Sequence, residues 1–295
     1  MKMAVKYIRI ILSTLHGYLL CIIYLLMPVR KLSCSDREPN LIVSLTSYGR
    51  RISKTLRFSL LSMLHQTRMP DRIVVWLNEK EFTMDSIPSY LKKYSDKYGI
   101  EIKFCPDLKS FKKLIPSLKY FPNDLIVTID DDLVYKRDLI RLLYEKHLQY
   151  PGLVICSNAH VPTFSGKCLL PYKQWNLNAY NAKDRIIFPL GGSGTLYPPH
   201  SLHSDVLDQC LFLNLAPSAD DVWFWCMGLL NGTSSVVLGT KRMYMEIDLF
   251  YQTVHKYSSL KSKNLAEDMN DTQIKAVFDH YGLIPDKELL ENMLH

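Results

Sequence analysis

The sequence lacks the glycine-rich signatures that bind phosphate through backbone amides alone. Glycine provides only 12 of the 295 residues, and neither GxxxxGK(S/T) nor GxGxxG occurs. The seven cysteines are an odd number and form no CxxC pair, which disfavours a disulfide framework and a structural zinc site. A reduced, cytosolic domain with free thiols in its core is expected instead.

Positive charge is unevenly distributed along the chain. The whole sequence carries 36 basic and 29 acidic residues, a net charge of +7, whereas residues 1–40 alone carry six basic and two acidic residues, or 6 − 2 = +4. The rest of the chain is close to neutral for its size. A nucleic-acid partner is therefore not expected, because such proteins concentrate basic residues over a groove-sized surface. A membrane surface fits the basic N-terminal segment better.

Residues 10–28, IILSTLHGYLLCIIYLLMP, form an apolar run that is almost long enough to cross a bilayer. His16, Gly17 and the preceding Arg9 weaken the case for a span, and no small-residue cleavage site of a signal peptide follows. Two interpretations stay open: a single-pass anchor, and an interfacial helix that lies in the headgroup layer. Basic residues at both ends leave the orientation open.

Beyond this run the pattern alternates between strands and helices. It predicts strands at 41–46, 72–77, 101–105, 124–130 and 153–156, and helices at 54–66, 90–98, 109–119, 137–149 and 218–230. This order predicts an α/β fold with a mainly parallel sheet and right-handed crossovers. We expect an N-terminal segment at 1–38, a catalytic domain at 39–257 and a helical tail at 258–295 on or near that domain.

Three adjacent carboxylates stand out in the stretch VTIDDDLVY, residues 127–135. Repulsion among them disfavours folding unless a cation, hydrogen bonds or raised pKa values relieve it. If the segment is extended, Asp130 and Asp132 point to one side and Asp131 to the other. Two carboxylates on one side can hold Mg²⁺ or Mn²⁺ together with substrate phosphates. Turn and cap chemistry for the helix at Arg137 is the alternative.

Two further segments could carry chemistry. The loop Gly191–Thr195, GGSGT, could be a flexible wall that lets backbone approach a sugar or diphosphate, or a plain tight turn. Asp220 and Asp221 stand at the start of the predicted helix VWFWCMGLL, where acidic residues complement the helix dipole. One of the two could instead face the cleft as a general base.

Together these features resemble bacterial GT-A glycosyltransferases related to family 2, encoded among polysaccharide, O-antigen and capsule genes. The resemblance runs from Leu41 to about Gly282, and its landmarks are LIVSLTSYGRRI, SLLSMLHQTRMPDRIVVWL, KKLIPSLKYFPNDLIVTIDDDLVY, GGSGTLYPP and ADDVWFW. The combination is specific, although each piece alone is weak. It implies a GT-A (Rossmann-like), mainly parallel sheet flanked by helices. Residues 1–40 lie outside the resemblance, and the membrane-associated N-terminal helix is expected from their apolar run and basic charge alone.

The resemblance also implies which residues form the site. Asp130-Asp131-Asp132 is similar to the family's DxD element, with Asp132 on the metal and Asp130 near the nucleotide ribose or the metal. Asp221 matches the base of inverting members, but Asp220 stands where glutamate is commoner, so the assignment between the two stays open. The implied nucleotide-sugar contacts are Thr46, Ser47, Tyr48, Arg50, Asn78, Lys113, Asp130 and Asp131. The implied acceptor or sugar contacts are Gly191, Gly192, Gly194, Tyr172 and Trp175, although core packing explains the last two equally well.

The sequence therefore predicts a metal-dependent, inverting glycosyltransferase that uses Mn²⁺ or Mg²⁺. It would move a hexose from a nucleotide diphosphate, UDP by expectation, to a glycan or lipid-linked acceptor at the cytoplasmic face of a bacterial inner membrane. A nucleotidyltransferase acting on sugar phosphates is one alternative, although its glycine-rich, lysine-bearing loop after the first strand is missing. A non-catalytic, membrane-tethered nucleotide- or glycan-binding protein is another, and the intact carboxylates argue against it.

Overall fold

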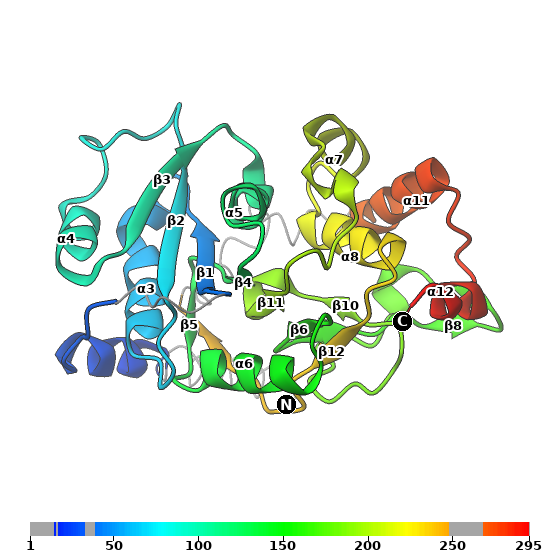
Figure 1. Ribbon diagram of the computed structural model, residues 1–295, viewed down its shortest axis with the longest axis horizontal. Coiled ribbons are helices and arrows are strands. Elements are labelled where there is room, and N and C mark those ends of the chain that lie inside the picture. The colour runs from blue at the N-terminus through cyan, green and yellow to red at the C-terminus, as the bar shows by residue number, and fades with distance from the viewer. Residues whose placement is uncertain (1–14, 16, 33–38, 248–267, 295) are drawn as a thin grey trace, which may run out of the picture.

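Seven strands form the central sheet, in the order β12-β6-β11-β4-β1-β2-β3 (Figure 1). The computed structural model describes residues 15, 17–32, 39–247 and 268–294. Within this sheet only β11 is antiparallel to its neighbours, β4 and β6, and all the other pairings are parallel. The predicted α/β class, with a mainly parallel sheet flanked by helices, is confirmed.

The first half of the chain builds four parallel strands and the helices that cover them. The strands are β1 (Leu41–Thr46), β2 (Arg72–Asn78), β3 (Glu101–Cys105) and β4 (Leu125–Thr128), and the helices are α2 (Arg51–Lys54), α3 (Leu56–Leu64), α4 (Ser89–Tyr98), the 3₁₀ helix η1 (Lys109–Lys113) and α5 (Ile115–Tyr120). Alternate residues of β1 face opposite layers. Val43 and Leu45 belong to the large core that includes α3, whereas Ser44 contacts η1 and α5. Both faces of the strand are buried because helices cover both.

The second half of the chain adds shorter strands. They are β5 (Leu133–Tyr135), β6 (Val154–Cys156), β7 (Ala159–His160), β8 (Phe164–Ser165), β9 (Cys168–Leu169), β10 (Phe188–Pro189), β11 (Thr195–Tyr197), β12 (Ser235–Val237) and β13 (Tyr244–Glu246). Helix α6 (Leu139–Gln149) packs against β6 and β11 at the lower edge of Figure 1. In the register of β11, Thr195 lies opposite Thr128 on one side and Cys156 on the other. The start of β11 therefore lies at the carboxyl end of β4.

Helices of the C-terminal half surround an aromatic core at the right of Figure 1. They are η2 (Tyr172–Gln174), η3 (Gly191–Ser193), η4 (Ser204–Leu207), α7 (Gln209–Leu215), α8 (Asp220–Leu230), α11 (Met269–Tyr281) and α12 (Lys287–Met293). Helix α8 is apolar on every side after its first two residues, so it must be buried among other elements. Phe278 of α11 stacks on Trp225 of α8 with ring centroids 5.9 Å apart. This contact fixes α11 against α8.

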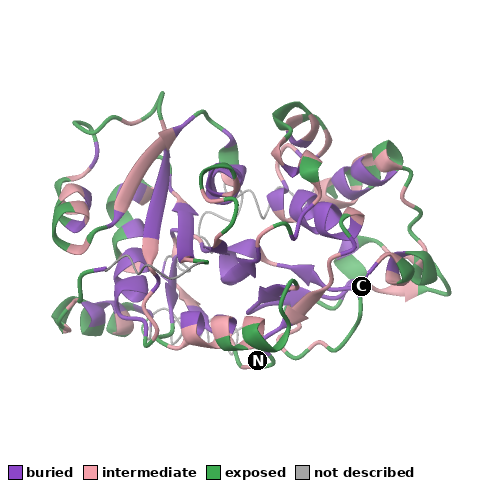
Figure 2. Cartoon of the chain, viewed as in Figure 1, coloured by how far each residue is buried: buried purple, intermediate pink, exposed green. Residues whose placement is uncertain are grey.

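Residues 17–26 form a helix at the lower left of Figure 1. Cys21 and Tyr24 on this helix are buried, and the Tyr24 ring stacks on His65 just beyond α3 at 5.1 Å. The remaining side chains of the helix are largely exposed, as the green colour in Figure 2 shows. Among the residues that the structure describes, no helix is long and apolar enough to span a membrane.

Several predicted boundaries differ from the structure by one residue or more. The helix predicted at 109–119 is divided at Leu114 into η1 and α5, because Pro116 lacks an amide hydrogen and is favoured only in a first helical turn. The strand predicted at 124–130 ends at Thr128, and a turn leads into β5. Helix α8 begins at Asp220 rather than Ser218. The division into segments 1–38, 39–257 and 258–295 stays a prediction, and its boundary at 258 lies outside the described residues.

Candidate functional site

A cleft of about 610 Å³ lies at the carboxyl ends of β1 and β4, where ligands gather in open α/β sheets. Its lining comes from segments far apart in the sequence. The first half of the chain contributes Thr46, Tyr48, Arg51, Lys112, Lys113 and the three aspartates at 130–132, and the second half contributes His160, Tyr172, Asn178, Gly192, Asp220, Asp221, Tyr244 and Glu246. The volume falls in the range of about 300–1,000 Å³ that is usual for small-molecule sites.

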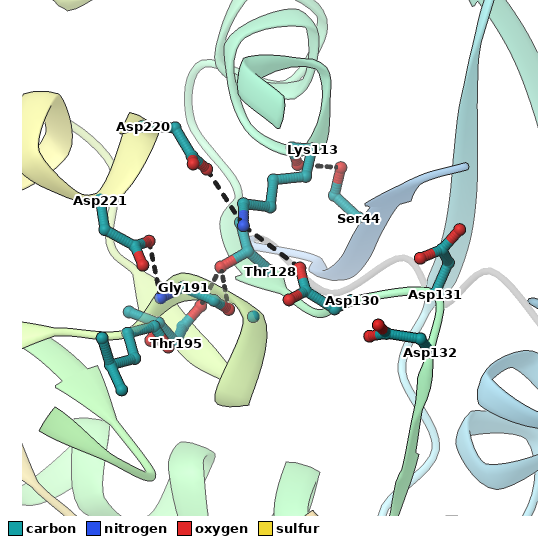
Figure 3. A network of polar contacts seen from close by, with 12 residues as sticks. Ser44, Lys113, Thr128, Asp130, Asp131, Asp132, Gly191, Thr195, Asp220 and Asp221 are labelled. Atoms are coloured by element: carbon teal, nitrogen blue, oxygen red, sulfur yellow. Dashed lines mark hydrogen bonds and ion pairs between the residues drawn. The ribbon is translucent and has the colours of Figure 1, made fainter. Parts of the chain in front are cut away.

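The three adjacent aspartates form a turn between β4 and β5 rather than an extended segment. The expected alternation of their side chains is therefore wrong. Asp131 accepts hydrogen bonds from Ser47 Oγ at 2.6 Å and from Arg51 Nη1 at 3.0 Å. The same Arg51 nitrogen lies 3.2 Å from Asp132 Oδ2. Asp131 and Asp132 thus share one guanidinium, whereas Asp130 turns toward Lys113 (Figure 3).

Burial and mutual repulsion raise the pKa values of two aspartates in this turn. The pKa of Asp132 is raised to about 7, chiefly by burial, which Arg51 opposes and the charges of Asp130 and Asp131 reinforce. The pKa of Asp131 is also raised by burial, against the effects of Arg51 and Ser47. Burial therefore disfavours the ionised form of these carboxylates, and a bound cation would favour it.

Arg51 is a site residue that the sequence reasoning missed. Arg50 was predicted instead, but its side chain is exposed and does not line the cleft. Tyr48 is 49% exposed at the cleft edge, and the Arg51 guanidinium lies 5.1 Å from its ring centroid. The turn at Gly49, with φ +51°, decides which of two adjacent arginines faces the carboxylates. No sequence pattern distinguishes them.

Lys113 joins the two acidic segments of the cleft (Figure 3). Its Nζ lies 3.2 Å from Asp130 Oδ1 and 3.0 Å from Asp220 Oδ2. Ser44 Oγ on β1 donates to the Lys113 carbonyl oxygen at 2.6 Å, which fixes the end of η1 against the sheet. Burial tends to lower the pKa of Lys113, but Asp130, Asp220 and Asp221 raise it well above its usual value. Lys113 is therefore a buried, permanently charged ammonium group.

Asp220 and Asp221 begin α8 but neither caps it, because the N-cap position is Ala219 and carries no side-chain cap. The capping role expected of Asp220 is thus replaced by its ion pair with Lys113. Asp221 Oδ1 accepts the Gly191 N–H at 3.0 Å. Burial, followed by the charge of Asp220, raises the pKa of Asp221 to about 7, against the effects of Lys113 and the Gly191 amide. A carboxylate with this pKa can accept a proton near neutral pH.

The glycine loop is a closely packed turn rather than a flexible wall. A Cβ atom at Gly192 would overlap the carboxylate of Asp130. Gly194 has φ +101°, and a Cβ there would lie 2.9 Å from a methyl group of Leu139. The Tyr135 hydroxyl accepts the Asp130 N–H at 2.8 Å and donates to the Gly192 carbonyl at 2.5 Å. Tyr135 thereby fixes the loop against the aspartate turn.

The two predicted acceptor aromatics have different positions. Tyr172 lines the cleft although only 7% of its surface is exposed. Trp175 is 4% exposed, and its indole nitrogen donates to the Leu170 carbonyl oxygen at 2.8 Å in the aromatic core, away from the cleft lining. His160 and Asn178 also line this part of the cleft, and the Asn178 N–H donates to His160 Nδ1 at 3.0 Å. Neither was found from the sequence, since both lie in a segment without regular periodicity.

Of the other predicted nucleotide contacts, Thr46 lies in the cleft and Ser47 lies behind it. The Thr46 hydroxyl donates to the Trp76 carbonyl oxygen at 2.9 Å, and Ser47 is fully buried beneath Asp131. Asn78 ends β2 and its Oδ1 accepts the Lys80 N–H at 3.0 Å, so it stabilises a turn and does not line the cleft.

The donor set of the aspartate turn is compatible with a hard divalent cation. The described residues contain no group of three or more His, Cys, Asp or Glu side chains that could hold a metal alone. A nucleotide-bound Mg²⁺ or Mn²⁺ usually takes only one or two carboxylates, with phosphates and water as the remaining ligands. Asp130, with a side chain that is 40% exposed, and Asp132, with its raised pKa, fit that role.

Comparison with protein-family models finds no match, and comparison with curated proteins finds none either. Among solved structures, the chain is similar to S. aureus TarS 1-349, with a TM-score of 0.46 and 14% identity over 81% of this chain and 70% of that one. The complex of TarS 1-349 with UDP gives a TM-score of 0.47 and 15% identity over 82% and 72%. The complex with UDP-GlcNAc gives 0.47 and 15% over 70% and 57%. The chemistry of the cleft therefore rests on the residues of this chain.

Proposed function

We propose that the chain is an inverting glycosyltransferase that transfers a sugar from a nucleotide diphosphate, UDP by our assignment, to a glycan or lipid-linked acceptor. The observation that supports this most is the position of Lys113 between Asp130 and Asp220. It brings a carboxylate turn suited to a metal–diphosphate and a carboxylate pair suited to base catalysis into one cleft. Both are needed for sugar transfer, and the Lys113 ammonium group is close to each.

In this proposal the donor diphosphate lies over the aspartate turn. The glycosidic bond breaks as the leaving diphosphate gains negative charge, while the sugar becomes oxocarbenium-like. Lys113 and Arg51 place two positive charges beside that leaving group. A Mn²⁺ or Mg²⁺ ion, held by Asp132 and Asp130, would supply Lewis-acid stabilisation of the same charge. The residues thus stabilise the additional negative charge that develops on the leaving diphosphate in the transition state.

Asp221 is our choice as the general base. It lies at the start of α8, and its pKa of about 7 lets it take the proton from the attacking acceptor hydroxyl. Attack from the face opposite the diphosphate inverts the anomeric centre. Asp220, held by Lys113, positions the ammonium group rather than accepting the proton. The acceptor would lie between Asp221 and the side of the cleft that contains Tyr172, His160 and Asn178.

The experiment that tests this function is a screen of the purified full-length protein against a panel of nucleotide sugars. Release of nucleoside diphosphate that depends on added acceptor supports sugar transfer. Release of pyrophosphate from a nucleoside triphosphate and a sugar phosphate would instead identify a nucleotidyltransferase. Nucleotide-sugar binding without any release would identify a binding protein. Once product is formed, NMR of the anomeric proton distinguishes inversion from retention.

A further inference from the structure

The helix at residues 17–26, with Leu15 just before it, has apolar side chains on two opposite sides. One side is buried against the domain through Cys21, 2% exposed, and Tyr24, 3% exposed. The other side forms an outer row of exposed large apolar residues: Leu15 at 59%, Tyr18 at 46%, Leu19 at 57%, Ile22 at 53%, Ile23 at 40%, Leu25 at 42% and Leu26 at 81%. A helix that packs on a soluble domain normally presents polar residues outward. The outer row therefore needs an apolar environment of its own.

The helix is fixed along the domain surface at several points. Tyr24 Oη donates to the Tyr135 carbonyl oxygen at 3.0 Å, and the Tyr24 ring stacks on His65. His65 Nε2 lies 3.4 Å from the Met27 carbonyl oxygen. Beyond the helix, the Leu32 N–H donates to the Tyr98 carbonyl oxygen at 2.9 Å at the end of α4. A helix held in this way lies flat on the domain, and its outer row faces away along the whole length.

The charges around the helix identify its partner as an anionic lipid surface. Residues 1–35 contain five basic residues and no acidic residue, and Arg30 and Lys31 are exposed directly after the helix. An apolar row flanked by basic residues is the pattern of helices that lie in the headgroup layer. If a second copy of the chain covered the row, an isologous contact would instead bring the basic flanks of both copies together. The structure therefore favours lipid over self-association.

We propose that the outer row, Leu15 to Leu26, inserts into one leaflet of an anionic bilayer and docks the domain on its surface without crossing it. Tyr24 then connects the membrane-bound helix to the site, because it bonds to Tyr135, whose hydroxyl contacts the Asp130 amide and the Gly192 carbonyl. The cleft is thus held at a fixed orientation to the lipid surface. For the proposed glycosyltransferase, on which this last step rests, such an orientation suits an acceptor that is itself attached to lipid.

Vesicle co-sedimentation of the full-length protein tests the docking. We expect binding to vesicles of phosphatidylcholine with phosphatidylglycerol, and weaker binding to phosphatidylcholine alone. The double variant Leu19→Glu/Leu26→Glu should lower partition into anionic vesicles by about tenfold or more, because each leucine contributes buried apolar area. Leu148→Glu on α6, at a leucine that is 62% exposed, is the matched control and should bind as the wild type does. Thermal melting of both variants confirms that they fold.

The depth of the helix in the bilayer and the oligomeric state of the protein distinguish the proposal from its two alternatives, a membrane-spanning helix and a subunit interface. Residue 19 lies at the middle of the apolar run 10–28, so a spanning helix would place it near the bilayer midplane. Fluorescence of Leu19→Trp should be quenched more by lipids brominated near the headgroup than by lipids brominated near the chain ends. Stronger deep quenching would overturn the proposal, as would unchanged vesicle binding by the double variant. If the double variant instead changes a dimer into a monomer without losing lipid binding, the row is a subunit interface. These measurements use no sugar donor, so their outcome does not depend on whether the protein catalyses the proposed transfer reaction.

Discussion

Lys113 and Asp220 form an ion pair across the cleft, with 3.0 Å between Nζ and Oδ2, and both side chains are nearly buried. The pair connects the end of η1 to the first residue of α8. Since each partner lies in a different half of the chain, the pair contributes both to stability and to the alignment of the two acidic segments.

We expect Lys113→Met to lower the free energy of unfolding by about 3 kcal/mol, because a buried carboxylate loses its partner. Asp220→Asn in the same chain should recover part of this loss, with a coupling of about 1–3 kcal/mol in a double-mutant cycle. Lys103→Met on β3 removes an ion pair to Glu101 in which both side chains are 30% exposed, and should change stability by less than about 1 kcal/mol. Urea unfolding followed by circular dichroism measures the wild type, Lys113→Met, Asp220→Asn, the double variant and Lys103→Met. Additive effects of the two substitutions would contradict the coupling.

Asp221→Asn should slow transfer by roughly 10²- to 10⁴-fold while folding and donor binding persist, because amide and carboxylate have the same shape and only the carboxylate accepts the proton. Asp208→Asn at the start of α7, where the carboxylate caps the Leu211 N–H, keeps a capping side chain outside the cleft and should be active. Single-turnover rates with saturating donor separate chemistry from binding. Near wild-type turnover of Asp221→Asn would exclude it as the base and shift attention to Asp220.

The pH dependence of transfer should follow Asp221. Its pKa is raised to about 7, first by burial and then by Asp220, and a base acts only when deprotonated. We therefore expect kcat/KM to rise with pH through about 7 and to level off above it. Asp220→Asn removes a negative charge that raises this pKa, so it should shift the acid limb to lower pH. A limb that does not move, or that moves upward, would contradict the assignment.

Substitution of Asp132 should abolish the effect of a divalent metal ion on nucleotide binding. Isothermal titration with UDP should show tighter binding when Mn²⁺ is added to the wild type, and no effect of Mn²⁺ in Asp132→Asn. Asp138→Asn, at a carboxylate that is 49% exposed and bonded to Arg141, is the control and should respond as the wild type does. Full transfer activity in excess chelator would refute a role for the ion.

Gly192→Ala should damage the site although alanine is small. The added methyl group overlaps the Asp130 carboxylate, so either the loop or the aspartate turn must shift. Overpacking of this kind lowers stability by about 1–3 kcal/mol, and donor affinity should fall with it. Gly228→Ala within α8 has its nearest neighbour at 3.7 Å and should be tolerated or stabilised by about 0.5–1 kcal/mol. Equal behaviour of the two alanine variants in melting and titration would show that the close approach at Gly192 has no role.

The spacing of apolar residues in the sequence predicted the strands and helices well wherever that spacing determines the secondary structure. The strands at 41–46 and 101–105 have the predicted bounds, because both segments are short, contain β-branched residues and are flanked by Gly, Pro, Asn or Ser. Boundaries that depend on single residues were less accurate, as Pro116 shows. The acidic clusters were found as candidates, and their positions in one cleft follow from the parallel sheet.

The contacts between clusters could not be predicted. Arg51, rather than Arg50, reaches the aspartates because of the backbone turn at Gly49, which no periodicity encodes. Two cations reach the triple aspartate, Arg51 from α2 and Lys113 from η1, and tertiary packing alone brings them there. Trp175 was a candidate on the strength of its aromatic face, and only the packing of Phe188 and Trp225 around it places it in the core.

The reversed direction of β11 has an evolutionary consequence. Since β6 ends and β11 begins at the same edge of the sheet, residues 157–194 leave the sheet and return to it beside the cleft. An insertion, deletion or replacement within this excursion leaves the register of the seven strands unchanged. Descendants of this chain are free to exchange the part of the excursion before the glycine loop, and so to diversify the region of the cleft lined by His160, Tyr172 and Asn178 while the glycine loop and the aspartates are inherited unchanged.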